Sequence, residues 1–259
     1  MVFVVYDMNI ISLNAWEGKL HKDLLTFVDA KSTTTDIFCF QEMCRGVSGI
    51  KVMDDRSVAT LYDDIQKLLP DHVGYFAPVQ SGVFELAMFI HKDITVTEHD
   101  DFLVYLERDA FDPSDPNSYP RSVQYSRIQK DGKEILIANL HGLWKRDVNK
   151  MDIPERIKQS EIIRDFLNAI DTPKILIGDY NLLPDTDSMA ILDTEMGMKN
   201  LIAEYGITNT RNPNYSAYYG APHFADYCHV SKEIYVRDFK VLPDVVSDHQ
   251  PLLIDFSLR

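Results

Sequence analysis

Apolar runs bounded by polar residues recur along the whole chain and predict β-strands. Residues 8–14 (MNIISLN) and 36–42 (DIFCFQE) are apolar almost without interruption, which is typical of strands that are covered on both faces. Between two later runs, DGK at 131–133 has the composition of a hairpin turn. Further strands are predicted at 73–79, 85–91, 121–129, 133–140, 174–178, 224–230, 234–241 and 251–258.

Three other segments have helical spacing. In the first, apolar residues between 20 and 28 fall on one helical face, and in the second the apolar spacing of 58–69 ends at Pro70. The third runs from about Pro154, a residue favoured in a first helical turn, to Ile170. Strands mixed with helices predict an α/β layered architecture. The Asp-, Pro- and Ser-rich segment 107–121 is predicted to be a long loop inside one domain that spans 1–259.

Composition places the 259-residue chain among ordinary globular proteins, with 45% hydrophobic and 25% charged residues. The 26 basic and 40 acidic residues give a net charge of −14, which argues against tight, salt-sensitive binding to a nucleic-acid backbone. That charge does not exclude hydrolysis of a phosphate ester, because a bound divalent cation supplies positive charge locally. The three cysteines form no C-x-x-C pair, which predicts a cytoplasmic protein. The sequence shows no basic leader and no apolar run near 18 residues, which predicts that the protein has no membrane span.

Polar residues follow the apolar strands at the points where chemistry is expected. Each alone has a plain alternative, because Asn or Asp after a strand is usually a turn former and a histidine there is as often a structural one. Together they offer carboxylate, amide and imidazole groups, the donors that suit a hard cation and a phosphate. These residues are Asn14, Glu42, His141, Asp179, Asn181, Asp226, Asp248 and His249.

In chain order, the motifs SLNAW, FQE, NLH, GDYN, DYCHVS and SDH resemble the endonuclease/exonuclease/phosphatase superfamily of deoxyribonuclease-I-like, metal-dependent phosphoesterases. The resemblance runs from the first predicted strand to the last. It implies a four-layer α/β sandwich, in which two packed, mainly antiparallel β-sheets are flanked by helices. It also implies a metal-assisted attack of water on phosphorus.

The resemblance assigns three residues to the metal. Glu42 would be the principal Mg²⁺ ligand with Asn14 close by, and Mn²⁺ would substitute for Mg²⁺. Mg²⁺ keeps several waters and accepts few carboxylates, so a sparse ligand set is expected. Asp248 would lie at the metal edge, and the choice between one and two cations stays open.

The remaining motif residues would act on the substrate. Asp179 would orient or deprotonate the attacking water, and Asn181 would donate a hydrogen bond to the phosphoryl oxygens. His249 would bind the phosphate, with Asp226 holding its imidazole. His141 would lie near the leaving group or the phosphate.

Four further features bear on the substrate, and each has two readings, which for Arg121 have equal weight. Arg121 resembles a family arginine that faces the phosphate, or it closes a loop. Trp144 walls the cleft or pins its own loop. Tyr215, Tyr218 and Tyr219 stack on a base or a sugar, or pack their loop on the scaffold. The locally basic segment 145–158 flanks an anionic substrate or, more simply, begins a solvated helix.

The leading hypothesis is therefore a Mg²⁺-dependent phosphoesterase, monomeric, with a phosphodiester preferred over a monoester. Nucleic acid, a small phosphodiester, a phospholipid and an inositol phosphate all remain open as substrates. A second hypothesis, a phosphate-binding scaffold without activity, is disfavoured because the polar set is complete. A serine or cysteine hydrolase lacks its G-x-S-x-G motif, and no Walker A, dinucleotide or H-E-x-x-H motif occurs.

Overall fold

The computed structural model describes residues 7–46, 55–81, 84–112, 114–130, 132–146, 148–215 and 223–258. Its strands form two six-stranded sheets, in the orders β11-β12-β1-β2-β4-β3 and β5-β6-β7-β8-β10-β9. The strands are β1 (Asp7–Asn14), β2 (Ile37–Cys44), β3 (His72–Gln80), β4 (Phe84–His91), β5 (Thr95–Tyr105), β6 (Arg121–Lys130), β7 (Lys133–His141), β8 (Lys174–Asp179), β9 (Lys199–Asn200), β10 (Asp226–Val230), β11 (Ile234–Val241) and β12 (Leu252–Leu258).

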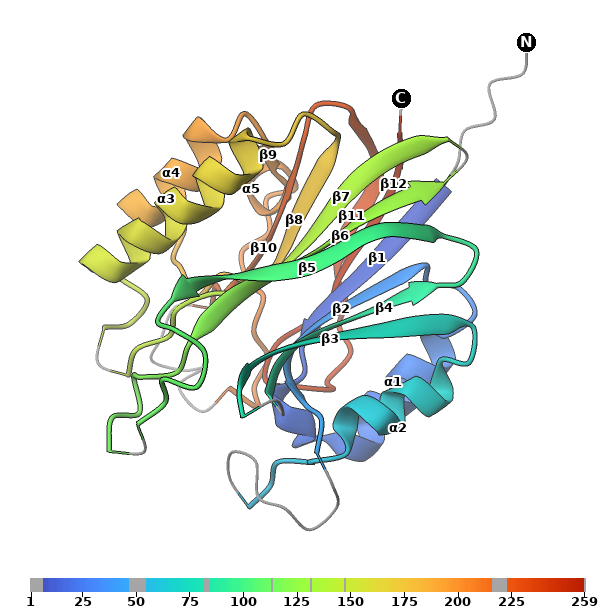
Figure 1. The fold of residues 1–259 in the computed structure, drawn as a ribbon, viewed down its shortest axis with the longest axis horizontal. Helices are drawn as coiled ribbons and strands as arrows, with labels where there is room; N and C mark the ends of the chain where they lie inside the picture. Colours follow the sequence, from blue (N-terminus) through green and yellow to red (C-terminus); the bar gives the residue numbers. More distant parts are fainter. Residues whose placement is uncertain are drawn as a thin grey trace.

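Helices cover the outer face of each sheet (Figure 1). α1 (His21–Lys31) and α2 (Leu61–Leu68) pack on the sheet that contains β1, and α3 (Pro154–Asn168) and α4 (Asp187–Glu195) pack on the other. A 3-10 turn, η1 (Trp16–Gly18), and the short α5 (Leu201–Glu204) complete the described elements. The predicted four-layer sandwich is confirmed. None of the helices in the described ranges is long and apolar enough to cross a membrane.

Two parallel strand pairs set the position of the polar strand ends. β1 pairs with β2 and β7 pairs with β8 in parallel, while the other pairs in both sheets are antiparallel. A parallel pair needs a crossover connection, and α1 and α3 supply it. Consequently the C-terminal ends of β1 and β2 share one edge of their sheet, and those of β7 and β8 share one edge of theirs.

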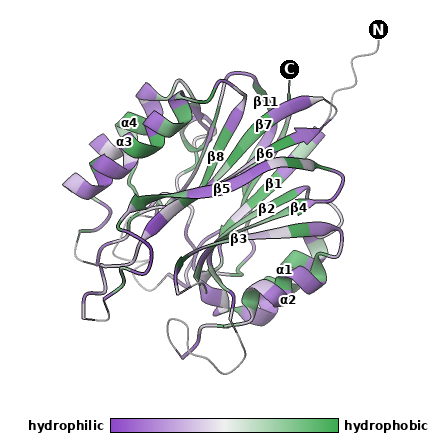
Figure 2. Cartoon of the chain, in the orientation of Figure 1, coloured by the Kyte–Doolittle hydropathy of each residue, from purple (hydrophilic) through white to green (hydrophobic). Residues whose placement is uncertain are grey.

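The apolar core fills the space between the two sheets and the space under each helical layer. Figure 2 shows apolar residues along the central strands and on the helix sides that face them. Cys39 and Cys228 lie in the core cluster between the sheets, and Cys44 lies in the cluster under α1 and α2. All three thiols are buried and form no disulfide, and burial raises the pKa of each.

The hydrophobic pattern missed five elements, of which β5 and α4 are the longest and η1, β9 and α5 are the others. β5 is an edge strand that is largely solvated, and Glu98, Asp100 and Asp101 interrupt its apolar positions. α4 has a weakly segregated apolar face and depends on Thr186, whose side chain accepts a hydrogen bond from the backbone of Met189 at 3.2 Å. Of the predicted 131–133 turn, Asp131 lies outside the described residues, while Gly132 has a φ of +79°.

Candidate active site

Four of the eight polar residues singled out in the sequence lie at strand ends. Asn14, His141 and Asp179 are the last residues of β1, β7 and β8. Asp226 begins β10 and lies opposite Asp179 in the antiparallel β8–β10 pair. The sandwich therefore gathers residues that are more than 200 positions apart in the sequence at one edge.

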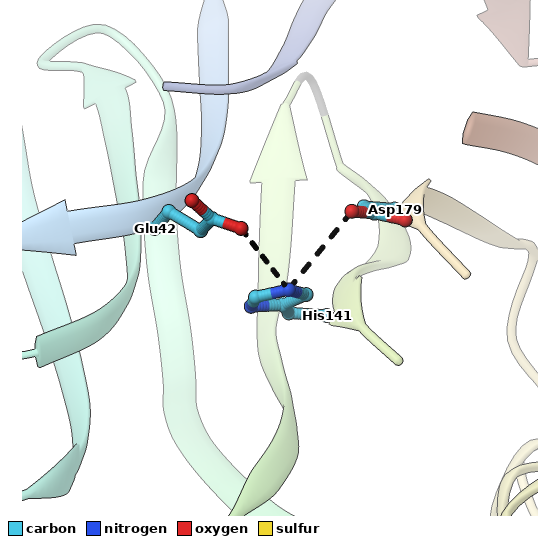
Figure 3. A group of neighbouring side chains, drawn as sticks. All are labelled: Glu42, His141 and Asp179. Carbon is cyan, nitrogen blue, oxygen red and sulfur yellow. Dashed lines mark ion pairs between the residues drawn. The ribbon is translucent and has the colours of Figure 1, made fainter. Parts of the chain in front are cut away.

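Glu42, Asn14, His141 and Asp179 form one connected cluster. The Asn14 side-chain amide donates to Glu42 Oε1 and to Asp179 Oδ2, both at 3.0 Å. His141 Nε2 lies 3.7 Å from Glu42 Oε1 and 3.9 Å from Asp179 Oδ2 (Figure 3). One ligand atom from each of Glu42, His141 and Asp179 lies within 4.8 Å of the other two. This spacing and these donors suit a hard divalent cation.

His141 is held from behind by Glu85, a residue the sequence analysis missed. Glu85 is fully buried in β4, its Oε1 contacts His141 Nδ1, and its Oε2 lies 3.4 Å from the Arg121 guanidinium. A carboxylate against one ring nitrogen fixes the orientation of the other. The available signal was an acidic residue at the start of the apolar run FELAMFI, since a buried acid requires a partner.

Asp179 is buried and surrounded by donors. Its Oδ1 accepts the Asn181 backbone N–H at 2.9 Å, and its Oδ2 accepts from Asn14 and lies 3.6 Å from His249 Nε2. Burial alone would raise the pKa of this carboxyl group, but the positive charges of His249 and His141 outweigh burial and lower it far below the usual value. Asp179 is therefore an ionised carboxylate.

His249 is oriented by Asp226. Both oxygens of the Asp226 carboxylate lie 2.9 Å from His249 Nδ1, which leaves Nε2 facing Asp179. Burial and the charge of Arg211 would lower the pKa of His249, but Asp226, Asp248 and Asp179 together raise it above the ordinary value. The imidazole thus retains its proton to higher pH than a solvated histidine does.

Gly142 joins the two halves of the site. Its N–H donates to the Asp179 carbonyl at 2.7 Å, and its carbonyl accepts from Arg121 Nε and from the Asn181 side-chain amide, both at 3.2 Å. These contacts give Arg121 the loop-closing role considered above, while Arg121 also lines the cavity described below. Asn181 Oδ1 is buried and has no hydrogen-bond partner among the described residues.

Gly142→Ala is expected to damage the site more than a typical glycine substitution. A Cβ at this position would lie 2.1 Å from the Tyr180 carbonyl oxygen, so the backbone that carries Asp179 and Asn181 must move. Overpacking of this kind costs about 1–3 kcal/mol. The checks are the free energy of unfolding in urea and kcat/KM. The control is Gly206→Ala, which has a φ of +60° but an open surrounding and should lower stability without changing kcat/KM.

Glu42 and Asn181 are two of the site residues that stand on strained backbone. Glu42 has a φ of +52°, where the β2–β4 register is interrupted, and Asn181 has a φ of +53° directly after β8. The left-handed region is unfavourable for residues with a Cβ, and more so for glutamate than for asparagine. In both cases the unusual backbone presents the side chain at the polar edge of the sandwich.

A cavity of about 310 Å³ opens onto these residues. It includes Trp144, whose side chain is 39% exposed at the rim, and Tyr215; Tyr218 and Tyr219 lie outside the described residues. Asn14, His141 and Asp226 are buried and do not line this cavity. The lining residues are Trp16, Glu17, Glu42, Phe84, Pro116, Tyr119, Arg121, Trp144, Asp179, Asn181, Arg211, Tyr215, Asp248 and His249.

Asp248 pairs with Arg211, and its place at the metal edge stays a prediction. Its Oδ2 pairs with an Arg211 guanidinium nitrogen at 2.8 Å, and its Oδ1 lies 3.8 Å from His249 Nε2. It belongs to neither of the clusters of three metal-ligating residues found in the described part of the chain. The sequence analysis missed Arg211, which lies in a polar loop without a motif.

Buried Lys150 is a second basic side chain beside the site. Its amine donates to the Phe224 carbonyl at 2.6 Å, and burial together with the charge of Arg211 lowers its pKa to about 7. Two lysines of the predicted basic segment 145–158 therefore differ in burial. Lys150 is buried beside the site, whereas Lys158 pairs with Glu161 at 3.4 Å on the exposed face of α3.

Residues 11–249 match the Endonuclease/Exonuclease/phosphatase family. The chain belongs to this family. The match spans every motif residue listed above, from Asn14 to His249, and confirms the resemblance. Members of the Endonuclease/Exonuclease/phosphatase family are hydrolytic phosphoesterases, and their metal dependence agrees with the cluster around Glu42. A search of curated proteins returned no match.

Solved structures of the Endonuclease/Exonuclease/phosphatase family share this fold. A family protein from Bacteroides thetaiotaomicron superposes with a TM-score of 0.77 at 17% identity, covering 98% of this chain and 99% of that one. The mannosyl-6-phosphatase of the same organism superposes with a TM-score of 0.75 at 18% identity, covering 96% of this chain and 99% of that one. The human Nocturnin catalytic domain with bound sulfate superposes with a TM-score of 0.69 at 17% identity, covering 98% of this chain and 95% of that one. At these identities the likeness concerns the fold alone.

Proposed function

We propose that this protein is a Mg²⁺-dependent phosphoesterase, with Mn²⁺ able to substitute, that cleaves the P–O bond of a phosphate ester by attack of water. The observation that carries this proposal is the approach of the Asp179 carboxylate to His249 Nε2, 3.6 Å away, in the cavity beside Glu42. A base, a hydrogen-bond donor and a ligand set for a metal thus share one space.

The residues present fit a divalent cation. Glu42 and Asp179 offer carboxylate oxygens, and His141 Nε2 is buried without a hydrogen-bond partner among the described residues. Glu42, with Asn14 beside it, would hold the cation, and few protein ligands are what Mg²⁺ accepts. When bound, the cation supplies positive charge to the phosphoryl group. The pairing of Asp248 with Arg211 supports a role for Asp248 in positioning that arginine.

The side chains of this protein divide the chemistry between them. Asp179, ionised and held by two N–H donors, accepts a proton from the attacking water. His249 donates from Nε2 to a phosphoryl oxygen, and Asp226 holds the imidazole and balances its charge. The Asn181 side-chain amide has a second N–H beyond the one given to Gly142, available to the same phosphoryl group.

Two substrate types remain within this proposal. The sequence favours a phosphodiester and leaves phosphomonoesters open. Among the similar folds, one protein is named a mannosyl-6-phosphatase and another, D. rerio TDP2, is complexed with a single-strand DNA product. These names support testing a sugar phosphate and a nucleic-acid end alongside simple aryl esters.

The experiment is a turnover assay of the purified protein on an aryl phosphomonoester and an aryl phosphodiester, with Mg²⁺, Mn²⁺ or EDTA. Hydrolysis is expected with either cation and none with EDTA. Glu42→Gln, which removes the anionic ligand, is expected to lower kcat/KM about 100-fold and to raise the Mg²⁺ concentration needed for half-maximal rate. The control Glu161→Gln, on the exposed face of α3, should change neither. Turnover that resists EDTA and survives Glu42→Gln would contradict the proposal.

A further inference from the structure

Arg211 is a fixed cation in the cavity wall. Its backbone pairs with that of His249 in an isolated antiparallel bridge, and the neighbouring Asn212 amide donates to the Ser247 carbonyl at 2.7 Å and to the His249 carbonyl at 3.0 Å. Its guanidinium carbon lies 4.4 Å from the centre of the Tyr215 ring. The arginine is therefore tied to the same loop as His249 and packed against an aromatic face.

The Arg211 guanidinium retains donors that the protein does not use. One nitrogen bonds Asp248 at 2.8 Å, while Nε is buried and has no hydrogen-bond partner among the described residues. The residue is 5% exposed and lines the cavity together with Asp179 and Asn181. A buried, charged N–H without an acceptor is costly, so an anion that enters the cavity would satisfy it.

Two acidic residues on this side of the cavity are paired with basic side chains. Asp226 is paired with His249, and Asp248 is paired with Arg211. Across the cavity, Arg121 lies beside Glu85. Within the described residues, the wall around Arg211 therefore presents N–H donors beside one ionised carboxylate, that of Asp179. A phosphate that enters together with a divalent cation would meet these donors despite the net charge of −14 for the whole chain.

The number of donors separates the two types of phosphate ester. A phosphomonoester has three terminal oxygens and a charge of about −1.5 to −2 at pH 7, because its second pKa is about 6. A phosphodiester has two terminal oxygens and a single charge. A cation held by Glu42, the Nε2 donor of His249 and the Asn181 amide would all contact the phosphoryl group. Arg211 adds a charged donor that a third terminal oxygen can use.

The size of the cavity also favours one organic group over two. Its volume of about 310 Å³ is at the lower end of the range for small-molecule pockets, about 300–1,000 Å³. Five aromatic side chains line it: Trp16, Phe84, Tyr119, Trp144 and Tyr215. Such walls suit the flat face of a sugar, a base or an aryl ring.

We propose that Arg211 is a specificity-determining residue that binds the third terminal oxygen of a small phosphomonoester, and that the protein hydrolyses such monoesters in preference to diesters. This inference rests on the proposed function and replaces the diester preference drawn from the sequence. In the reaction, the oxygen of water forms a bond to phosphorus, the ester P–O bond breaks, and the leaving alcohol oxygen takes up a proton. The products are one alcohol and inorganic phosphate.

The test compares 4-nitrophenyl phosphate and a hexose 6-phosphate with bis(4-nitrophenyl) phosphate, using Mg²⁺-loaded protein. The wild type is expected to have the higher kcat/KM on the monoesters. Arg211→Gln should lower kcat/KM about 100-fold on the monoesters and less than about 3-fold on the diester. Arg211→Lys keeps the charge but loses the planar fork, so the monoester loss should be smaller, about 10-fold. The control Lys232→Gln removes one exposed charge beyond the far end of β10 and should leave the ratio unchanged.

The ratio of the two esters separates substrate binding from a structural role. If Arg211 only positions Asp248, the monoester and diester rates fall equally, and the inference is wrong. If the wild type prefers the diester, the inference is wrong while the proposed function stands. If neither ester is hydrolysed with Mg²⁺ or Mn²⁺, the proposed function fails and the inference fails with it. Should Arg211→Gln not fold, the ratio measured for Arg211→Lys decides, and an unchanged ratio there overturns the inference.

Discussion

Asp179→Asn is expected to abolish metal-dependent hydrolysis while leaving the protein folded. The amide has nearly the shape of the carboxylate, and its oxygen can still accept the Asn181 N–H that now lies 2.9 Å from Oδ1. It cannot take a proton from water, and it brings no negative charge to face His249. Loss of a general base lowers the rate about 10²–10⁴-fold, and the accompanying loss of charge places the expected effect at the upper end.

The measurement for Asp179 is kcat/KM on the better of the two aryl esters, with circular dichroism and thermal unfolding on the same sample. Asp185→Asn is the matched control, because Asp185 is exposed in the loop that follows the motif GDYN. It should retain the wild-type rate. Metal-dependent turnover in folded Asp179→Asn protein at more than about one tenth of the wild-type rate would rule out the assignment of Asp179 as the base.

His249→Ala is expected to lower kcat/KM about 10³-fold. It removes the Nε2 donor that faces Asp179, and donors of this kind contribute about 10²–10³-fold. It also leaves the Asp226 carboxylate buried without its partner, which reduces stability by several kcal/mol. His249→Gln, which retains an amide N–H, should lose less stability and recover part of the rate.

The pH dependence of the hydrolysis rate tests whether the charge of His249 contributes to the reaction in addition to its hydrogen-bond donor. Because its pKa is raised, the protonated form that donates to the phosphate is present below the folded pKa and is lost as the pH rises through that value. The wild-type rate should therefore fall on the alkaline side, above the ordinary histidine range near 6.5. His249→Gln has no such proton to lose, and its profile should lack that decline. An unchanged alkaline decline in His249→Gln would assign it to another group.

Much of the sandwich could be predicted because buried strands leave a strong hydrophobic signal. β11 was predicted with its observed bounds, and β1 and β2 within two residues of theirs. β5 could not be predicted in this way, because an edge strand with one solvated face keeps charged residues at positions where a central strand has apolar ones. Such a strand is defined by its hydrogen bonds to β6, which the sequence does not display.

The candidate site was predictable where a polar residue interrupts an apolar run at its end. Asn14, Glu42 and Asp179 share that position, and the structure brings their side chains into contact. Glu85 lies at the beginning of a strand, and its role follows only from its contact with His141 of the other sheet, which the sequence does not show. Arg211 lies in a polar loop where an arginine is ordinarily solvated, and only the pairing of that loop with the segment before β12 buries it.

The left-handed backbone at Glu42 and Asn181 has a consequence for engineering this protein. Each such residue costs about 1–2 kcal/mol relative to a relaxed conformation, and glycine would remove that cost. Directed evolution for heat resistance alone should therefore enrich glycine at both positions and yield robust but inactive proteins. A selection that demands turnover in every round would retain the strained pair and find its gains elsewhere in the scaffold.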